Sequence, residues 1–307
     1  MELSLFDLHC DTAYEMLRQK QPLSSNHLAI SLENARKFKR YIQVMALWTD
    51  LKLDDGSGWQ SCLAMLENLR NDATITSGDA MIQTSVSEDL RPTLLLAVED
   101  ARILDGKLER VDRLYQSGIR ILTPLWKGLT CIGGSHDTDQ GLTPFGKKAL
   151  KYALDLGMIL DISHASECSA EDIFALAKEK KRPMIASHSN AYSVCPVSRN
   201  LRDGQIQSIL SSDGIIGINL YRGFLTQDGN ACAEDILPHI EYFLEQGAKN
   251  ALCIGGDMDG AELPDDIPNL SALPLLAELM LKHNYPEKLI YDIFYQNAFR
   301  FAQKYLF

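Results

Sequence analysis

The sequence lacks the features that mark secreted, membrane-spanning and nucleic-acid-binding proteins. Its seven cysteines include no Cys-x-x-Cys pair, so we expect reduced thiols rather than a disulfide framework. No apolar run approaches the roughly 20 residues that a membrane-spanning helix needs, and no basic segment precedes the short apolar stretch near the N-terminus. A net charge of −11 disfavours nucleic acid and anionic lipid as partners. These absences predict a cytoplasmic protein.

Two further absences bear on the architecture. No low-complexity segment or Pro/Ser-rich linker divides the chain, so we expect residues 1–307 to form a single domain. A doubly wound sheet that binds a dinucleotide needs a glycine-rich phosphate loop after its first strand. The segment HCDT, which follows the first apolar run, contains no glycine. The doubly wound sheet is therefore only the alternative fold.

Short apolar runs rich in β-branched residues alternate with longer stretches of helical periodicity along the whole chain. Several helical stretches end in a glycine suited to a left-handed cap, at Gly118, Gly157 and Gly247. Eight strands that alternate with helices favour a parallel (β/α)8 barrel. The predicted strands are 3–8, 41–48, 93–99, 119–123, 158–164, 183–188, 214–220 and 251–257. The predicted helices are 62–74, 104–116, 145–156, 170–180, 205–210, 234–246, 273–282 and 288–305.

Acidic and imidazole side chains stand at the ends of five of these eight strands. They are His9 with Asp11, Glu99, His164, His188 and Asp257. The active site of a (β/α)8 barrel lies at the C-terminal ends of its strands. We therefore expect these side chains to meet at one end of the barrel.

The donor types and their spacing suit a metal centre. Residues i and i+2 of an extended chain point the same way, so His9 and Asp11 can bind one ion. His164 and His188 end neighbouring strands and can bind a second ion, while Glu99 can place one oxygen on each. Imidazole and carboxylate donors without thiolate favour two zinc ions with an open position. Other divalent transition metals suit the same donors.

Each of these residues also has a purely structural explanation when it is considered alone. A lone His-x-Asp is a weak signal, and Glu99 could supply negative charge at a helix N-terminus. His164 and His188 could be satisfied core histidines. It is their joint placement at strand ends that favours the metal site. His136, in a long loop after the fourth strand, could overhang it.

These residues lie in motifs that resemble the membrane (renal) dipeptidase family of binuclear zinc peptidases. The resemblance covers nearly the whole chain, through DLHCDT, GLTPFGKKALKYALDLGMILDISHAS, ASHSNAYSVCPVSRN, IGGDMDG and NAFRF. It implies a barrel of the metallo-dependent hydrolase type. It also implies a ligand set for two zinc ions: His9, Asp11 and Glu99 on one, and Glu99, His164 and His188 on the other.

The resemblance implies roles for three more residues. Arg199 would clamp the substrate carboxylate, a bidentate task that suits a guanidinium, although alone it would indicate a surface salt bridge. Asp257 would move a proton beside the metals, whereas Asp259 fits a loop-capping role better. Trp126 stands where better-known eukaryotic members carry a histidine. Because indole donates one hydrogen bond and takes no proton, we expect substrate binding at Trp126 to differ.

Together these features predict hydrolysis of dipeptides, including L,D-dipeptides, by a hydroxide that bridges the two zinc ions. Asp257 and Glu99 are the predicted catalytic residues, and Arg199, Trp126 and Asp257 the predicted substrate-binding residues. The expected partner is a small dipeptide, with no nucleic acid and no membrane, and the family is compatible with a homodimer. The first alternative is a binuclear amidohydrolase of another small amide, a lactam or an N-acyl amino acid. The second is a non-catalytic barrel, which would predict loss of at least one ligand.

Overall fold

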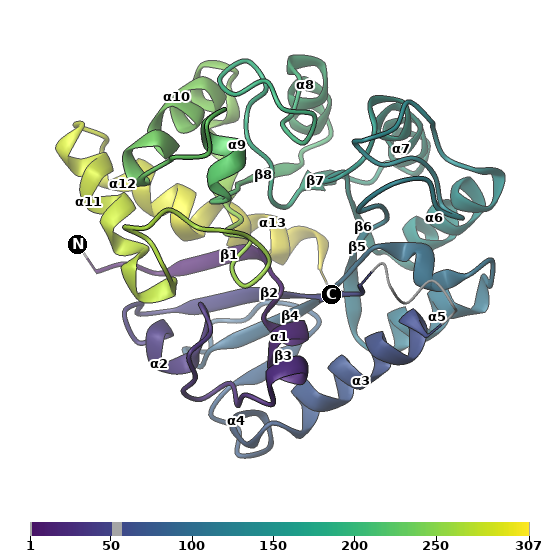
Figure 1. The fold of residues 1–307 in the computed structure, drawn as a ribbon, viewed down its shortest axis with the longest axis horizontal. Helices are drawn as coiled ribbons and strands as arrows, with labels where there is room; N and C mark the ends of the chain where they lie inside the picture. The colour runs from purple at the N-terminus through teal and green to yellow at the C-terminus, as the bar shows by residue number, and fades with distance from the viewer. Residues whose placement is uncertain (1, 51–56, 307) are drawn as a thin grey trace.

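A closed parallel barrel forms the centre of the computed structural model, which describes residues 2–50 and 57–306 (Figure 1). The ring runs β1–β2–β4–β5–β6–β7–β8–β9, with β9 paired to β1 and every pair parallel. Its strands are β1 (Leu5–Cys10), β2 (Tyr41–Trp48), β4 (Thr93–Glu99), β5 (Ile119–Thr123), β6 (Ile159–Asp161), β7 (Met184–Ala186), β8 (Ile215–Ile218) and β9 (Leu252–Ile254). The predicted (β/α)8 barrel is confirmed, and the doubly wound sheet is excluded.

One short strand lies outside the ring and was not predicted. β3 (Met81–Gln83) pairs with the first three residues of β4, whereas β5 pairs with β4 only from Leu96 onward. The two strands therefore share one edge of β4, with β3 at its start and β5 at its end. Three partly exposed residues are too few for a period-2 pattern to emerge in the sequence.

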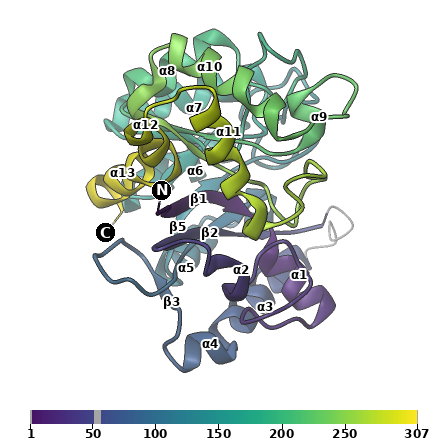
Figure 2. The ribbon, with the colours of Figure 1, turned by 90° about the vertical axis from the view of Figure 1, so that its left-hand side faces the viewer.

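Helices pack around the outside of the strands in both views (Figures 1 and 2). Those that the sequence predicted are α3 (Gly58–Asn71), α5 (Glu109–Gln116), α6 (Pro144–Leu156), α7 (Glu167–Lys180), α8 (Asp203–Ser211), α10 (Leu237–Glu245), α11 (Pro274–Lys282), α12 (Glu287–Tyr291) and α13 (Asn297–Tyr305). A π-helical turn, Asp292–Gln296, joins α12 to α13. The sequence did not predict α1 (Thr12–Gln19), α2 (Leu32–Ala35), α4 (Ala73–Thr76) and α9 (Arg222–Leu225). Short 3-10 turns are Ala101–Leu104, Ala233–Ile236, Ala248–Asn250 and Leu270–Ala272.

The helix ends follow local rules that the sequence displays. Thr143 caps α6 by accepting a hydrogen bond from the Gly146 amide, and Pro144 occupies the first helical turn. Gly157 ends the same helix with φ 95°, the left-handed conformation expected of it. Gly118 and Gly247 also have positive φ, of 86° and 93°. None of the helices in the described ranges is long and apolar enough to cross a membrane.

Candidate metal centre and substrate pocket

A pocket of about 780 Å³ opens at the C-terminal ends of the strands. Six residues that the sequence singled out for this end line it: Asp11, Glu99, Trp126, His164, Arg199 and Asp257. His9 and His188 lie below them and are almost fully buried. Strand ends from both halves of the chain thus converge on one cavity, as the barrel geometry predicts.

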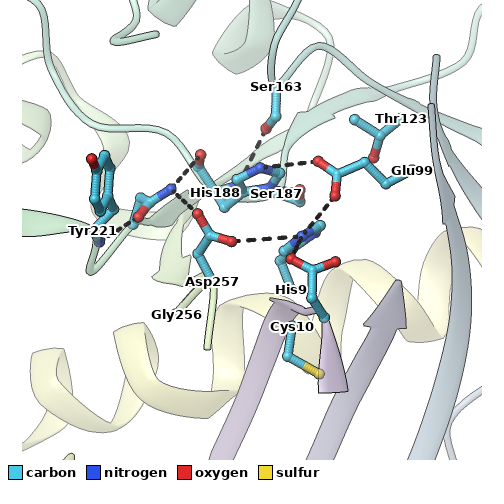
Figure 3. A network of polar contacts seen from close by, with 12 residues as sticks. His9, Cys10, Glu99, Thr123, Ser163, Ser187, His188, Tyr221, Gly256 and Asp257 are labelled. Atoms are coloured by element: carbon cyan, nitrogen blue, oxygen red, sulfur yellow. Dashed lines mark hydrogen bonds and ion pairs between the residues drawn. The ribbon is translucent and has the colours of Figure 1, made fainter. Parts of the chain in front are cut away.

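His9 is the centre of a first group of possible metal ligands (Figure 3). Its Nε2 lies 3.4 Å from Glu99 Oε2, 3.7 Å from Asp11 Oδ2 and 3.9 Å from Asp257 Oδ1. His9, Asp11 and Asp257 offer three donor atoms within 4.8 Å of one another. The Cys10 thiol between the ligands contacts Met45 Sδ instead, at 3.3 Å, so it faces the core.

The other Glu99 oxygen faces a second group. Glu99 Oε1 lies 3.0 Å from His164 Nε2 and 3.5 Å from His188 Nε2. The two histidine Nε2 atoms are themselves 3.0 Å apart. Glu99 therefore points one carboxylate oxygen at each group, which is the arrangement that a carboxylate shared by two cations requires.

Hydrogen bonds on the far side of each ring set the histidine tautomers. His164 Nδ1 lies 3.1 Å from the Trp126 carbonyl, which can only accept, so Nδ1 carries the proton. His188 Nδ1 lies 2.7 Å from Ser187 Oγ, whose own hydroxyl donates to Asp161 Oδ2. We assign the proton of His188 to Nδ1 on this network. Both Nε2 atoms then present bare lone pairs to the cavity, as metal ligands do.

Several buried atoms in the cluster have no hydrogen-bond partner among the residues that the structure describes. They are His9 Nε2, Asp11 Oδ1 and Glu99 Oε1. Buried polar atoms are nearly always satisfied, because an unpaired one costs about 1–3 kcal/mol. Divalent cations, one in each group, would satisfy these atoms, and the imidazole and carboxylate donors without thiolate fit zinc or a similar ion.

Burial dominates the electrostatics of the cluster. Desolvation raises the pKa of Glu99 to about 8 and that of Asp257 to about 6. It also lowers the pKa values of His164 and His188 well below their ordinary range. Burial lowers the pKa of His9 as well, but the carboxylates of Glu99 and Asp11 outweigh it and leave the value raised. A carboxylate-rich pocket of this kind favours positive charge.

Two cluster residues have backbone conformations that are unusual for a residue with a side chain. His164 has φ 69° and Asp257 has φ 55°, both in the left-handed region. Such conformations cost about 1–3 kcal/mol each and gather at functional sites. Gly260 follows in the same loop as Asp257, and a β-carbon there would lie 1.9 Å from Asp11 Oδ2. Any residue with a β-carbon at position 260 would therefore have to displace the Asp11 carboxylate.

Arg199 is buried and has no acidic partner among the residues that the structure describes. Only 5% of its surface is exposed, its guanidinium donates to Ser189 Oγ and to the His188 carbonyl, and it lies over the Phe224 ring. Its Nε has no partner, and no carboxylate of the described chain comes within ion-pair distance. The surface salt bridge that residue type alone would suggest is therefore absent from this part of the chain. A buried unpaired cation creates a strong demand for an anionic ligand.

The two aspartates of the DMDG segment have different surroundings. Asp257 Oδ2 accepts a hydrogen bond from Asn219 Nδ2 at 3.0 Å, which leaves Oδ1 facing His9. Asp259 instead accepts from the Thr12 hydroxyl and from the Ala29 amide. Asp257 is thus available to the pocket, while Asp259 ties together the loops around it.

The sequence analysis missed an aromatic wall on one side of the pocket. The Tyr14 and Trp48 rings meet edge to face at 4.8 Å, and Trp48 meets Trp126 in the same way at 5.1 Å. Tyr221 and Phe224, after β8, also line the pocket. Trp48 and Tyr221 lie at or just beyond strand ends, so the strand-end rule would have found them had it included aromatic residues.

His136 from the loop after β5 also lines the pocket. Burial and the neighbouring Arg199 guanidinium lower the pKa of His136 to about 4, so its ring is neutral at physiological pH. The sequence placed it above the site without a role.

Comparison with known proteins agrees with this geometry. The family model described as membrane dipeptidase (peptidase family M19) matches residues 1–305. A Klebsiella pneumoniae protein, described as an uncharacterized protein in the pqqA 5′ region, is 30% identical over 225 residues, 69% of this chain and 82% of its own length. Dipeptidase 3 of Macaca fascicularis is 29% identical over 222 residues, 68% of this chain but 45% of the macaque protein.

Among solved structures, the chain is similar to a metallo peptidase from Rhodobacter sphaeroides liganded with a phosphinate mimic of the dipeptide L-Ala-D-Ala. The TM-score is 0.91 with 23% sequence identity, and all of both chains is covered. At this identity the similarity establishes the fold.

Proposed function

The chain belongs to the membrane dipeptidase family and is a metallo-dipeptidase, and we propose the following roles for its residues in metal binding, substrate binding and proton transfer. His9, Asp11 and Glu99 hold one zinc ion, and Glu99, His164 and His188 hold the other. The unsatisfied His9, Asp11 and Glu99 atoms support this set. Arg199 binds the substrate carboxylate, and Asp257 accepts a proton and returns it to the leaving amine.

One observation carries the substrate assignment. The buried guanidinium of Arg199, with no acidic partner in the described chain, opens onto the same pocket as the metal-ligand cluster. A molecule that satisfies both must carry a free carboxylate within a short distance of a hydrolysable amide. A dipeptide has this shape, as does the C-terminal end of a longer peptide, and the dipeptidase family to which the chain belongs favours the dipeptide.

The residues around the cluster support the following mechanism. Divalent ions held by these histidines and carboxylates would supply a water of lowered pKa and a Lewis acid for the scissile carbonyl. Arg199 fixes the carboxylate and so orients the amide. Asn219 holds one oxygen of Asp257, which leaves the other free to accept a proton and return it to the leaving amine.

We also propose that L,D-dipeptides are substrates. The pocket of about 780 Å³ is lined by the aromatic wall and by the Tyr221 and Phe224 rings. The ligand of the Rhodobacter sphaeroides peptidase is a mimic of an L,D-dipeptide, which supports the same tolerance here.

The test is a substrate panel offered to zinc-loaded enzyme whose metal content has been measured by elemental analysis. We expect about two metal ions per chain and release of free amino acids from L,L- and L,D-dipeptides. N-acetyl amino acids and a small lactam serve as competitors. Turnover of an N-acetyl amino acid with higher kcat/KM than any dipeptide would contradict the proposal, and so would metal-loaded enzyme that cleaves no dipeptide.

A further inference from the structure

His136 is the one pocket-lining histidine to which neither the metal set nor the mechanism gives a task. Its ring centroid lies 5.8 Å from that of His164, and the pocket that it lines also contains Arg199. The positive charge of Arg199 contributes to the lowered pKa of His136. The imidazole therefore lies beside the proposed metal centre and lines the same pocket as the proposed carboxylate clamp.

The backbone holds His136 firmly in this place. Its amide donates to the His164 carbonyl at 2.7 Å, so His136 is anchored to the segment that follows β6. The preceding residue, Ser135, forms an isolated bridge with Ala165 and donates its hydroxyl to Asp137 Oδ1. A side chain on a loop fixed at these points is pre-organised for its contacts.

The ring is oriented from one side only. His136 Nδ1 lies 2.9 Å from the Ser198 hydroxyl, and Ser198 directly precedes Arg199 in the chain. Within the described part of the chain no hydrogen bond is found for His136 Nε2. When Ser198 donates to Nδ1, Nε2 carries the proton and is a free donor to a ligand in the pocket.

We propose that His136 is a substrate-binding residue that donates from Nε2 to the same carboxylate that Arg199 binds. The contact completes an anion site with one charged and one neutral donor, positioned together by the bond between Ser198 and His136. It rests on the proposed dipeptidase function and adds a second anchor for the C-terminal end of the substrate.

The experiment compares a dipeptide with its C-terminal amide, which lacks the carboxylate, in wild-type enzyme and in His136→Phe. Phenylalanine keeps a ring but has no donor. We expect His136→Phe to raise KM for the dipeptide by about 10- to 100-fold, as loss of a hydrogen bond to a charged group predicts. KM for the amide should change less than about threefold, and kcat for the dipeptide should change little.

Two more variants separate contact from structure. His136→Gln keeps an N–H donor and should recover much of the lost affinity, whereas His283→Phe alters an exposed histidine outside the pocket and should behave as wild type. Affinity for a phosphinate dipeptide mimic, measured by calorimetry in zinc-loaded enzyme, gives a readout independent of turnover. It should fall in His136→Phe and recover in His136→Gln.

Three outcomes would overturn the proposal. Equal losses for dipeptide and amide would indicate a structural role, a fall in kcat without a change in KM would place the contact at the reacting carbonyl, and no change would exclude the contact. Failure of the wild-type enzyme to cleave dipeptides would instead contradict the proposed function itself. The two failures are therefore distinguishable.

Discussion

The floor of the pocket and its wall are built in different ways. The floor (His9, Glu99, His188) comes from strand ends and is buried, and His188 is further held by a chain of hydrogen bonds through Ser187 to Asp161. The aromatic wall (Tyr14, Trp48, Trp126) is held by ring contacts, and Tyr14 and Trp126 come from segments that follow the strands.

This difference predicts that the floor and the wall have separate functions. The floor residues converge because the barrel forces the ends of its strands together, so their placement is as rigid as the sheet. The wall residues sit where substitutions change the shape of the pocket without disturbing the sheet. We therefore expect the floor to determine the reaction and the wall to determine which dipeptides react.

The largest effect should come from the residue that both ligand groups share. Glu99→Gln removes the carboxylate charge from the centre of the floor, and we expect kcat/KM to fall by about 10³-fold or more because metal stabilisation is worth several kcal/mol. Elemental analysis should show loss of metal. Glu109→Gln, on the exposed start of α5, is the matched control. Full activity of Glu99→Gln would contradict the shared-ligand proposal.

A smaller loss should follow from Arg199→Lys, at the edge between floor and wall. Lysine keeps the charge but cannot bind a carboxylate in a bidentate manner, so KM for dipeptides should rise by about 10- to 100-fold. Metal content should stay at the wild-type level. Steady-state kinetics with parallel metal analysis checks this, and an unchanged KM would show that the buried guanidinium does not bind substrate.

The support beneath the floor can be tested without measuring turnover. Ser187→Ala breaks the chain from Asp161 to His188 Nδ1, and we expect zinc affinity to fall by about 10- to 100-fold. Competition with a fluorescent chelator measures this affinity directly. Ser211→Ala, at the exposed end of α8, should leave it unchanged. Equal affinities in the two variants would mean that the network does not tune His188.

The smallest effect is expected at the wall. Trp126→Leu keeps the carbonyl that fixes His164 but removes the indole, so metal content should not change. Relative kcat/KM among dipeptides with different side chains should shift by about 10-fold, the scale of a changed apolar contact. An equal fall in kcat/KM for all dipeptides would instead show that Trp126 contributes to the reaction rather than to substrate preference.

Most of the fold could be predicted because strand and helix periods are local and repeated eight times. β3 was not predicted because it has three residues, and α1 was not predicted because eight residues span only about two turns of the helical period. Among the site residues, those at strand ends were predictable because topology brings them together. Arg199 is different: its type indicates the surface, and only the resemblance to a family suggested a role.

The aromatic wall and the hydrogen-bond chain behind His188 could not be predicted in the same way. Tyr14 and Trp126 meet through Trp48 only after the barrel closes, since the three rings come from widely separated parts of the chain. The partnership of Asp161 with Ser187 joins β6 to the end of β7, and an aspartate or serine in sequence carries no sign of it. Contacts of this kind depend on tertiary distance.

The close approach of Gly260 to Asp11 has a consequence for anyone redesigning the enzyme. In a mutagenesis library that randomises the loop after β9, Gly260 should be kept unchanged, because any larger residue displaces Asp11. Ala261 and Glu262 follow Gly260 in the chain and line the same cavity. We therefore expect substitutions at these two positions, rather than at Gly260, to change substrate preference.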